Sequence, residues 1–154
     1  MACDLAEGRR TLPGGPIFAR GGWLVEHCIG PLGVGTLIVK PRRHVERFAD
    51  LSVDEVAALG PLMHLTTKAL DELLSPDQTY ICQWAHAGWK AGHIHFVVQP
   101  SWDRLGRTHE RPGPFLQVEM FDAGEHPPEE GVAAFCARAR ETMARLEASE
   151  VVGA

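Results

Sequence analysis

The sequence predicts an α+β fold in which two main helices pack on an antiparallel sheet, and two observations carry this prediction. First, turn signals rich in Gly and Pro separate several short apolar runs that alternate in the way of strands. Second, two long segments carry helical patterns, one between the strand-like runs and one near the end of the chain. Strands, a helix, further strands and a final helix are typical of helices packed on one antiparallel sheet.

The composition is that of an ordinary globular domain. The 154 residues are 45% hydrophobic and 23% charged, which suits a single buried core. A formal net charge of -5 argues against a general electrostatic grip on nucleic acid. No apolar run is long enough to cross a bilayer, and the first ten residues do not look like a signal peptide. The four cysteines form no C-x-x-C pair and no dense framework, so we expect a cytoplasmic protein with free thiols. The charge and the absence of a long apolar run lead us to expect no nucleic-acid and no membrane partner.

The chain is expected to have three parts, which are an arm over residues 1–16, a single domain over residues 17–147 and a tail over residues 148–154. Within the domain, I-F-A-R and W-L-V-E-H-C-I flank a Gly-Gly turn and predict a β-hairpin. After a Gly-rich break, T-L-I-V-K predicts a third strand that ends at Pro41.

A capping box formed by Ser52 and Glu55 predicts the start of a helix that runs to about Leu74. Pro61 lies inside this segment and is expected to kink or interrupt the helix, since proline lacks the amide hydrogen of a helical bond. The helical pattern resumes near the end of the chain, where a second helix is expected from about Glu129 to Glu147.

The segment between the two helices predicts further strands. T-Y-I-C-Q-W and H-I-H-F-V-V-Q are expected to form two strands around a loop at Ala85–Gly92. Residues 101–114 are polar, contain Pro and Gly, and predict another loop. F-L-Q-V-E-M-F alternates between apolar and polar residues and predicts one more strand.

One of these strands, G-H-I-H-F-V-V-Q-P, carries the chemically informative residues. Side chains alternate along a strand, so His93, His95, Val97 and Gln99 share one face and the apolar residues between them share the other. Neutral imidazole can attack phosphorus, bind a transition metal or shuttle protons. Same-face neighbours lie roughly 7 Å apart, which suits separate roles for the two histidines. Two half-exposed histidines without any chemistry are an equally good reading of the His-x-His pattern alone.

This strand resembles the signature of the histidine triad (HIT) superfamily, H-φ-H-φ-H-φ-φ followed by proline. Counting back from the proline places His93 at the first position, His95 at the second and Val97 at the third, so the motif reads H-x-H-x-V. A second segment, T-L-I-V-K-P-R-R-H-V, resembles the family's strand and basic turn that end in a histidine, here His44. The resemblance covers roughly residues 3–100 and implies a HIT-like fold.

The resemblance implies a nucleotidyl hydrolase or transferase whose partner is a nucleotide or another phosphorylated small molecule. His95 would attack the α-phosphate and form a covalent nucleotidyl-histidine, while His93 would position the substrate or hold zinc. The resemblance also implies a homodimer. Two alternatives stay open, which are a nucleotide- or partner-binding module with weakened catalysis, and a biosynthetic enzyme with a changed substrate.

The loop before the motif departs from the family pattern, because it lacks the G-Q-[ST] element that holds phosphate in typical members. Lys90 lies near the place of the hydroxyl residue. We expect Lys90, His86 and the backbone around Gly92 to contact a phosphate or carboxylate. Trp89 is a candidate for stacking on a base or an aromatic substrate. A solvated loop with an exposed lysine is the alternative.

The third position of the motif departs as well. Val97 cannot form a hydrogen bond, so a phosphate or leaving-group contact is lost there. The uridylyltransferase branch of the superfamily carries glutamine at this position. Gln99 lies one same-face step further along the strand and is expected to compensate in part if the strand end curls inward.

The zinc site of many family members is incomplete in this chain. The resemblance assigns Cys3, His44 and His93 as ligands, but Ala6 stands where a second cysteine is usual. Zinc takes four ligands in structural sites and three protein ligands with water in catalytic sites. Three readings therefore remain, which are a lost site, a site completed by a nearby carboxylate, and a three-ligand zinc with an open position.

Overall fold

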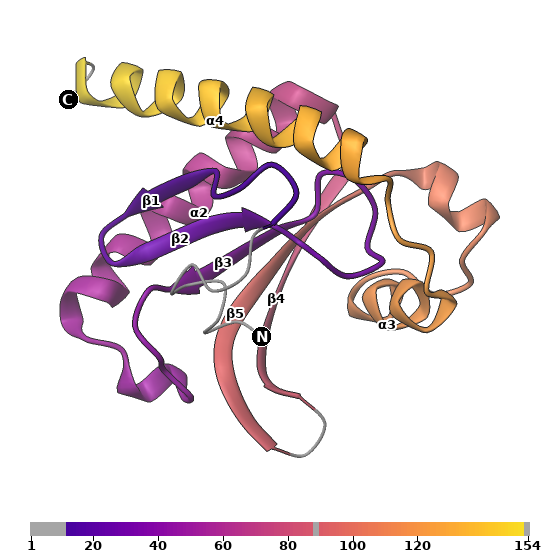
Figure 1. Cartoon of the computed structure of the whole chain (residues 1–154), viewed down its shortest axis with the longest axis horizontal. Coiled ribbons are helices and arrows are strands. Elements are labelled where there is room, and N and C mark those ends of the chain that lie inside the picture. Colours follow the sequence, from indigo (N-terminus) through magenta and orange to yellow (C-terminus); the bar gives the residue numbers. More distant parts are fainter. Residues whose placement is uncertain (1–11, 88–89, 153–154) are drawn as a thin grey trace.

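The computed structural model, which describes residues 12–87 and 90–152, contains one five-stranded antiparallel sheet (Figure 1). The spatial order is β1, β2, β3, β5 and β4, so the last two strands in the sequence exchange places. The strands are β1 (Phe18–Arg20), β2 (Trp23–His27), β3 (Leu37–Pro41), β5 (Lys90–Ser101) and β4 (Gln78–Ala87). This arrangement places β5, which carries the His-x-His motif, between two neighbours.

Two helices, α2 (Val53–Leu74) and α4 (Glu129–Val152), pack against each other and cover one face of the sheet. Figure 1 shows α4 beside β1 and β2, while α3 (Pro114–Ala123) stands apart from the other two helices. The main core lies between the helix pair and the apolar face of the inner strands. The predicted α+β class is therefore confirmed, with α3 as a helix beyond the two that were expected. None of the described helices is long and apolar enough to span a membrane.

The first half of the chain follows its local signals closely. β1 and β2 pair as the predicted hairpin. The capping box forms, because the Ser52 hydroxyl accepts from the Glu55 amide at 3.2 Å and the Glu55 carboxylate accepts from the Ser52 amide at 2.8 Å. The expectation that Pro61 interrupts the helix is wrong, since α2 continues through it. Pro61 is exposed, while Leu62 and Leu65 beside it are fully buried, so core packing on the opposite side holds the helix together.

The F-L-Q-V-E-M-F segment is helical, so the additional strand predicted there is wrong. Gly113 precedes Pro114 at the first turn of α3, and Gly124 ends the helix in a left-handed conformation with φ of 70°. Proline at the start and glycine just past the end are the usual boundaries of a helix. Alternation over so few residues fits a strand and a short helix about equally, and the two boundary signals decide between them.

The β4–β5 hairpin is longer than predicted. The strand pairing continues to Ala87 opposite Lys90, so most of the loop expected at Ala85–Gly92 is strand. A register shift lies between Trp84 and His86, which marks a bulge in β4. Residues 88 and 89 lie outside the described part of the chain.

The final helix is also longer than predicted. α4 continues to Val152 and so includes residues that were expected to form a tail after residue 147. No glycine or proline occurs between Glu147 and Val152, so no local signal ends the helix at the earlier position.

His27 is a buried structural histidine at the end of β2. Its Nε2 accepts a hydrogen bond of 2.9 Å from the Gly35 amide, so its Nδ1 carries the hydrogen and donates to the Cys28 carbonyl at 2.7 Å. Gly35 has φ of 95°, and a Cβ there would lie 2.5 Å from Leu74. His27 therefore fixes a turn that only glycine allows. Burial lowers the pKa of His27.

The lowered pKa of His27 predicts a loss of stability in mild acid. Below about pH 6.5 the unfolded chain binds a proton at this imidazole that the folded protein does not bind. The free energy of unfolding should therefore decrease as the pH is lowered. His27→Gln should cost about 1 kcal/mol at neutral pH through weakened hydrogen bonds, yet should flatten the pH dependence between about pH 7 and 5. Urea denaturation across this range measures both effects. The matched control is exposed His64→Gln, and an equally steep pH dependence in His27→Gln would contradict the prediction.

Candidate functional site

β5 carries a face that we call the histidine face, formed by His93, His95, Val97 and Gln99. The residues between them on β5 point to the opposite face and are buried there, Phe96 and Val98 in the main core. The neighbouring strands extend the histidine face, since directly paired residues share a side of a sheet. The cross-strand pairs are His95 with Trp84, Val97 with Ile38 and Cys82, and Gln99 with Tyr80.

His95 is half-buried, and the backbone sets its tautomer. Its Nδ1 lies 3.1 Å from the carbonyl oxygen of His93. A carbonyl oxygen only accepts hydrogen bonds, so Nδ1 carries the hydrogen and Nε2 keeps the lone pair. His95 therefore has the tautomer and the fixed ring orientation that an attack through Nε2 requires.

His93 is buried and is also oriented by a carbonyl group. Its Nε2 donates to the carbonyl of Pro41 at 2.8 Å, which leaves the lone pair on Nδ1. Desolvation lowers the pKa of His93, and the nearby His44 and Lys40 lower it further, so the neutral form is favoured. The rings of His44 and His93 pack edge to face with centroids 5.4 Å apart.

Two of the three expected zinc ligands are thus brought together. His44 is exposed, and its Nε2 lies 3.3 Å from the carboxylate of Glu46. Cys3 lies outside the described residues, and within the described ones no group of three His, Cys, Asp or Glu side chains could hold a metal ion. The neutral His93 nevertheless suits a metal ligand, because ligating histidines commonly donate their other ring hydrogen to a carbonyl.

The third position of the motif lies under an apolar cluster. Val97 is 4% exposed and packs with buried Cys28 and Leu32. Three partly buried side chains complete this group, which we call the Val97 cluster; they are Ile38, Trp84 and Met120. Met120 belongs to α3, so that helix and the loop after β2 cover the histidine face at this position. A phosphate group would have to displace this cluster to reach residue 97.

Gln99 lies beyond the Val97 cluster and is almost fully buried. Its Nε2 donates to the sulfur of Met120 at 3.1 Å, and its Oε1 has no hydrogen-bond partner within the described residues. Gln99 also lines a cavity of about 370 Å³, together with Leu32 and Met120. The structure therefore places Gln99 on the predicted face but separates it from His95 by the Val97 cluster.

The predicted phosphate-binding residues fall at the far end of the β4–β5 hairpin. His86 pairs with Ala91, Lys90 pairs with Ala87, and Gly92 directly precedes His93 in β5. Trp89 and the side chains of His86 and Lys90 lie outside the described part of the structure. Their proposed contacts with phosphate remain predictions.

A buried ion pair on the histidine face was not predicted from the sequence. Lys40 Nζ lies 2.5 Å from Glu26 Oε2, and both side chains are almost fully buried. Glu26 pairs with Ile38, which in turn pairs with Val97, so the ion pair shares their side of the sheet. The sequence does contain a signal for this pair, because one charged residue lies within each of two otherwise apolar strands, Glu26 in W-L-V-E-H and Lys40 in L-I-V-K-P. The positive charge of Lys40 helps to lower the pKa of His93.

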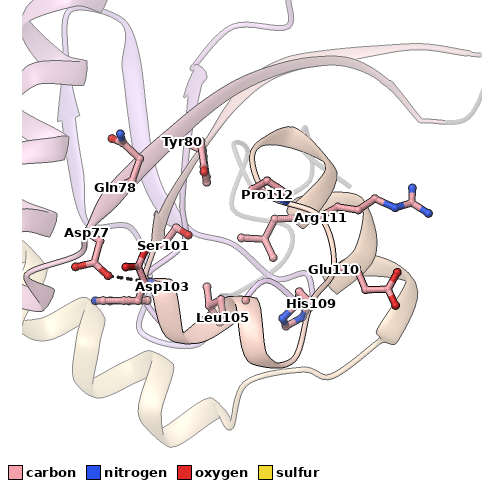
Figure 2. Close-up of a pocket in the computed structure, with 13 residues that line it drawn as sticks. Asp77, Gln78, Tyr80, Ser101, Asp103, Leu105, His109, Glu110, Arg111 and Pro112 are labelled. Atoms are coloured by element: carbon pink, nitrogen blue, oxygen red, sulfur yellow. Dashed lines mark hydrogen bonds between the residues drawn. The ribbon is translucent and has the colours of Figure 1, made fainter.

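A cavity of about 350 Å³ lies at the end of the hairpin opposite to the predicted phosphate-binding residues (Figure 2). It is lined by residues from the start of β4, the end of β5, the short helix η2 (Asp103–Arg107) and the segment before α3. Within it, the Asp103 amide donates to the Asp77 carboxylate at 2.8 Å. Of the predicted site residues whose side chains the structure describes, none lines this cavity.

The burial of Val97 predicts that a histidine cannot simply be restored at the third position. Val97→His should lower the free energy of unfolding by about 1–3 kcal/mol, because a larger and polar ring enters an apolar cluster. Urea denaturation measures the loss, and Val118→His on the exposed side of α3 is the matched control. If Val97→His is as stable as the parent protein, the Val97 cluster does not seal this position.

Comparisons with known proteins agree with this fold. No family model and no curated protein matches the sequence. Among solved structures, a hypothetical histidine triad nucleotide-binding protein from Sulfolobus tokodaii matches with a TM-score of 0.71 and 17% identity, over 94% of this chain and 92% of that one. A zinc-bound histidine triad family protein from Mycobacterium smegmatis gives 0.67 and 20%, over 96% and 95%. A HIT-like protein from Bartonella henselae, described as involved in cell-cycle regulation, gives 0.65 and 14%, over 90% and 92%. The chain therefore has the fold of the histidine triad proteins, as its motifs predict.

Proposed function

We propose that the protein is a nucleotidyl hydrolase or transferase that acts at the α-phosphate of a nucleotide, with His95 as the nucleophile. The observation that supports this most directly is the hydrogen bond between His95 Nδ1 and the His93 carbonyl, which leaves the lone pair on Nε2. His95 is also half-buried, whereas His93 is buried and the neighbouring Val97 is sealed by apolar side chains. His95 is therefore the histidine of the motif that can meet a substrate.

The proposed reaction has two displacements at phosphorus. The Nε2 lone pair of His95 attacks the α-phosphorus, an N–P bond forms, and the P–O bond to the leaving group breaks with its electron pair on the leaving oxygen. Water or another acceptor then attacks the same phosphorus, the N–P bond breaks with its electron pair on His95 Nε2, and the proton of the attacking group is released to solvent. Because Nδ1 keeps its hydrogen bond to the His93 carbonyl, the ring need not reorient between the steps.

The phosphate contacts in this proposal come from the end of the hairpin. Lys90 and His86 would supply positive charge and hydrogen-bond donors, and the backbone at Gly92 would approach the phosphate closely. Trp89 would stack on the base, and Gln99 would contribute only if the Val97 cluster opens.

The first prediction from this function concerns the covalent intermediate. After brief mixing with dinucleoside polyphosphates or aminoacyl adenylates and a quench that avoids acid, intact-mass spectrometry should detect a nucleotidyl adduct on the protein. The adduct and turnover should both disappear in His95→Ala, because the attacking nitrogen is gone. His64→Ala, which changes an exposed histidine of α2, is the matched control.

Three results would contradict the proposal in different ways. Adduct formation that persists in His95→Ala would assign the nucleophile to another residue. Binding of nucleotide without adduct or turnover would favour the second candidate, a binding module, which the apolar closure over Val97 supports. A protein that ignores nucleotides altogether would favour the changed-substrate enzyme.

We also propose that zinc is held by Cys3, His44 and His93, with a further ligand or an open position. The neutral His93, its donated hydrogen bond and the adjacent His44 ring support this assignment. Zinc at this place would tie Cys3 to the first residues of β5.

The zinc proposal predicts a measurable metal content. Protein purified without chelators should contain about one zinc ion per chain by elemental analysis. Cys3→Ser and His44→Ala should each lose most of it, because three protein ligands are few for tight binding. Cys82→Ser is the matched control, since this thiol is free and lies elsewhere on the sheet. Zinc-free parent protein, or full occupancy in His44→Ala, would contradict the assignment.

The remaining expectations concern assembly and location. We propose a homodimer on the basis of the family resemblance. We also propose a cytoplasmic location, with which the cysteines agree, since Cys28, Cys82 and Cys136 are free.

A further inference from the structure

We propose that the cavity of about 370 Å³ beside Gln99 binds a small aromatic carboxylate that also carries a hydroxyl group or an N–H. We call this space the Gln99 cavity, after the residue of β5 that lines it. The inference does not rest on the proposed function, because the Val97 cluster lies between Gln99 and His95. It assigns a ligand-binding site separate from the histidines of the motif.

The Gln99 cavity is formed by apolar side chains from distant parts of the chain. The loop after β2 contributes Leu32, the end of α2 contributes Leu74, and the segment after β5 contributes Trp102 and Leu105. Leu74, Trp102 and Leu105 are only partly buried, so apolar surface borders the cavity. Small-molecule sites are commonly apolar cavities of about 300–1,000 Å³ with a few polar groups. The Gln99 cavity has the size and lining of such a site.

Hydrogen bonds hold the walls of this cavity in place without a ligand. In the loop after β2, Thr36 Oγ1 donates to the carbonyl of Leu32 at 2.6 Å. At another wall, Trp102 Nε1 donates to the carbonyl of Ser75 at 3.3 Å, which ties the start of η2 to the end of α2. A preformed site binds a small ligand without the entropic cost of ordering its walls.

Arg104 gives the cavity a preference for an anion. Among the described residues that line the cavity, Arg104 alone carries a charge. Its guanidinium carbon lies 4.2 Å from the centroid of the Trp102 ring, a cation–π contact that holds the group beside the cavity. No ion pair joins Arg104 to a carboxylate of the described residues. A guanidinium donates two parallel hydrogen bonds to a carboxylate, so a carboxylate ligand suits this position.

Gln99 supplies a second polar group, which is an acceptor. Its Nε2 donates to the sulfur of Met120 at 3.1 Å, and the sulfur has no hydrogen to donate, which assigns the orientation of the amide. Its Oε1 has no hydrogen-bond partner within the described residues, although Gln99 is only 1% exposed. An unpaired buried acceptor costs free energy. A hydroxyl group or an N–H of the ligand would supply the missing donor.

The lining also favours an aromatic body between these two polar groups. Trp102 and Met120 both line the cavity, and both indole rings and thioether sulfurs make favourable contacts with aromatic rings. Arg104 is exposed, whereas Gln99 is buried. The carboxylate would therefore lie at the mouth of the cavity, and the hydroxyl group or N–H at its inner end.

The first test locates the ligand by NMR with 3-(4-hydroxyphenyl)propionate and the full chain. Titration should shift the methyl signal of Met120, assigned by its loss in Met120→Leu, until the site is saturated. Trp102 cannot serve alone, because it also lines the cavity of Figure 2, whereas Met120 lines only the Gln99 cavity of the two. Tyr80, the single tyrosine of the chain, reports on that other cavity. A shift at Tyr80 with none at Met120 would overturn the inference.

The second test measures the contribution of the charge by calorimetric titration. Arg104→Gln should weaken binding of the acid about tenfold, because charge-assisted hydrogen bonds are lost at an exposed position. The methyl ester of the acid should bind the parent protein more weakly by a similar factor, and should bind Arg104→Gln equally well. Arg107→Gln is the matched control, since Arg107 is an exposed arginine of η2 that does not line the cavity.

The third test concerns the acceptor. In the parent protein the hydroxyl group should tighten binding about threefold to tenfold relative to 3-phenylpropionate, as one additional hydrogen bond would. In Gln99→Met, which has a similar volume and no Oε1, the two acids should bind equally. Thermal unfolding checks that this variant is folded.

Several outcomes would overturn the inference. These are the absence of saturable binding, equal affinity for the acid and its ester, and undiminished binding in Arg104→Gln. A hydroxyl group without any advantage in the parent protein would overturn the role of Gln99. Displacement of the acid by AMP would place it on the histidine face and overturn the separate site. The proposed function can fail without any of these results, so the two failures are distinguishable.

Discussion

The position of β5 between β3 and β4, with both of its edges paired, is the constraint on which the rest of the structure depends. The two faces of such a strand lie in different environments. A shift of the strand pairing by one residue would turn every side chain to the opposite face, so the register is strongly specified. Ile94, Phe96 and Val98 bury on the side opposite the histidines, Phe96 and Val98 in the main core formed with α2 and α4. The packing of that core therefore fixes the direction of His93 and His95.

The histidine face is divided into two halves. Around His95 the face is partly open, whereas the Val97 cluster closes it one step further along the strand. This division gives a physical account of the altered motif. A third histidine would lie under Leu32 and Met120, where its polar ring would be desolvated, and valine fills that space without unpaired groups. The two histidines of the motif, His93 and His95, therefore lie at the end of the face that the Val97 cluster leaves uncovered.

Backbone carbonyl groups orient the two histidines at the open end of this face. Pro41 and His93 each present a carbonyl oxygen to an imidazole, which fixes one tautomer for His93 and another for His95. The buried Lys40–Glu26 pair adds a fixed charge arrangement on the same side of the sheet. Such a pair contributes little to stability in general, and here the charge of Lys40 also favours the neutral form of His93.

The sequence by itself determined the elements whose signals are local. The capping box at Ser52, the first hairpin and the two faces of β5 follow from spacing over a few residues, and the motif with His95 follows from the same alternation. Only the tertiary structure decided that α3 closes over Val97 and that Gln117 reaches Trp84, which is 33 residues away. Alternation over seven residues did not distinguish a strand from a short helix there, and no local rule specifies which distant surface covers a sheet. Partners of buried polar groups are likewise chosen by packing between distant segments, because each must find a donor or acceptor wherever the fold supplies one.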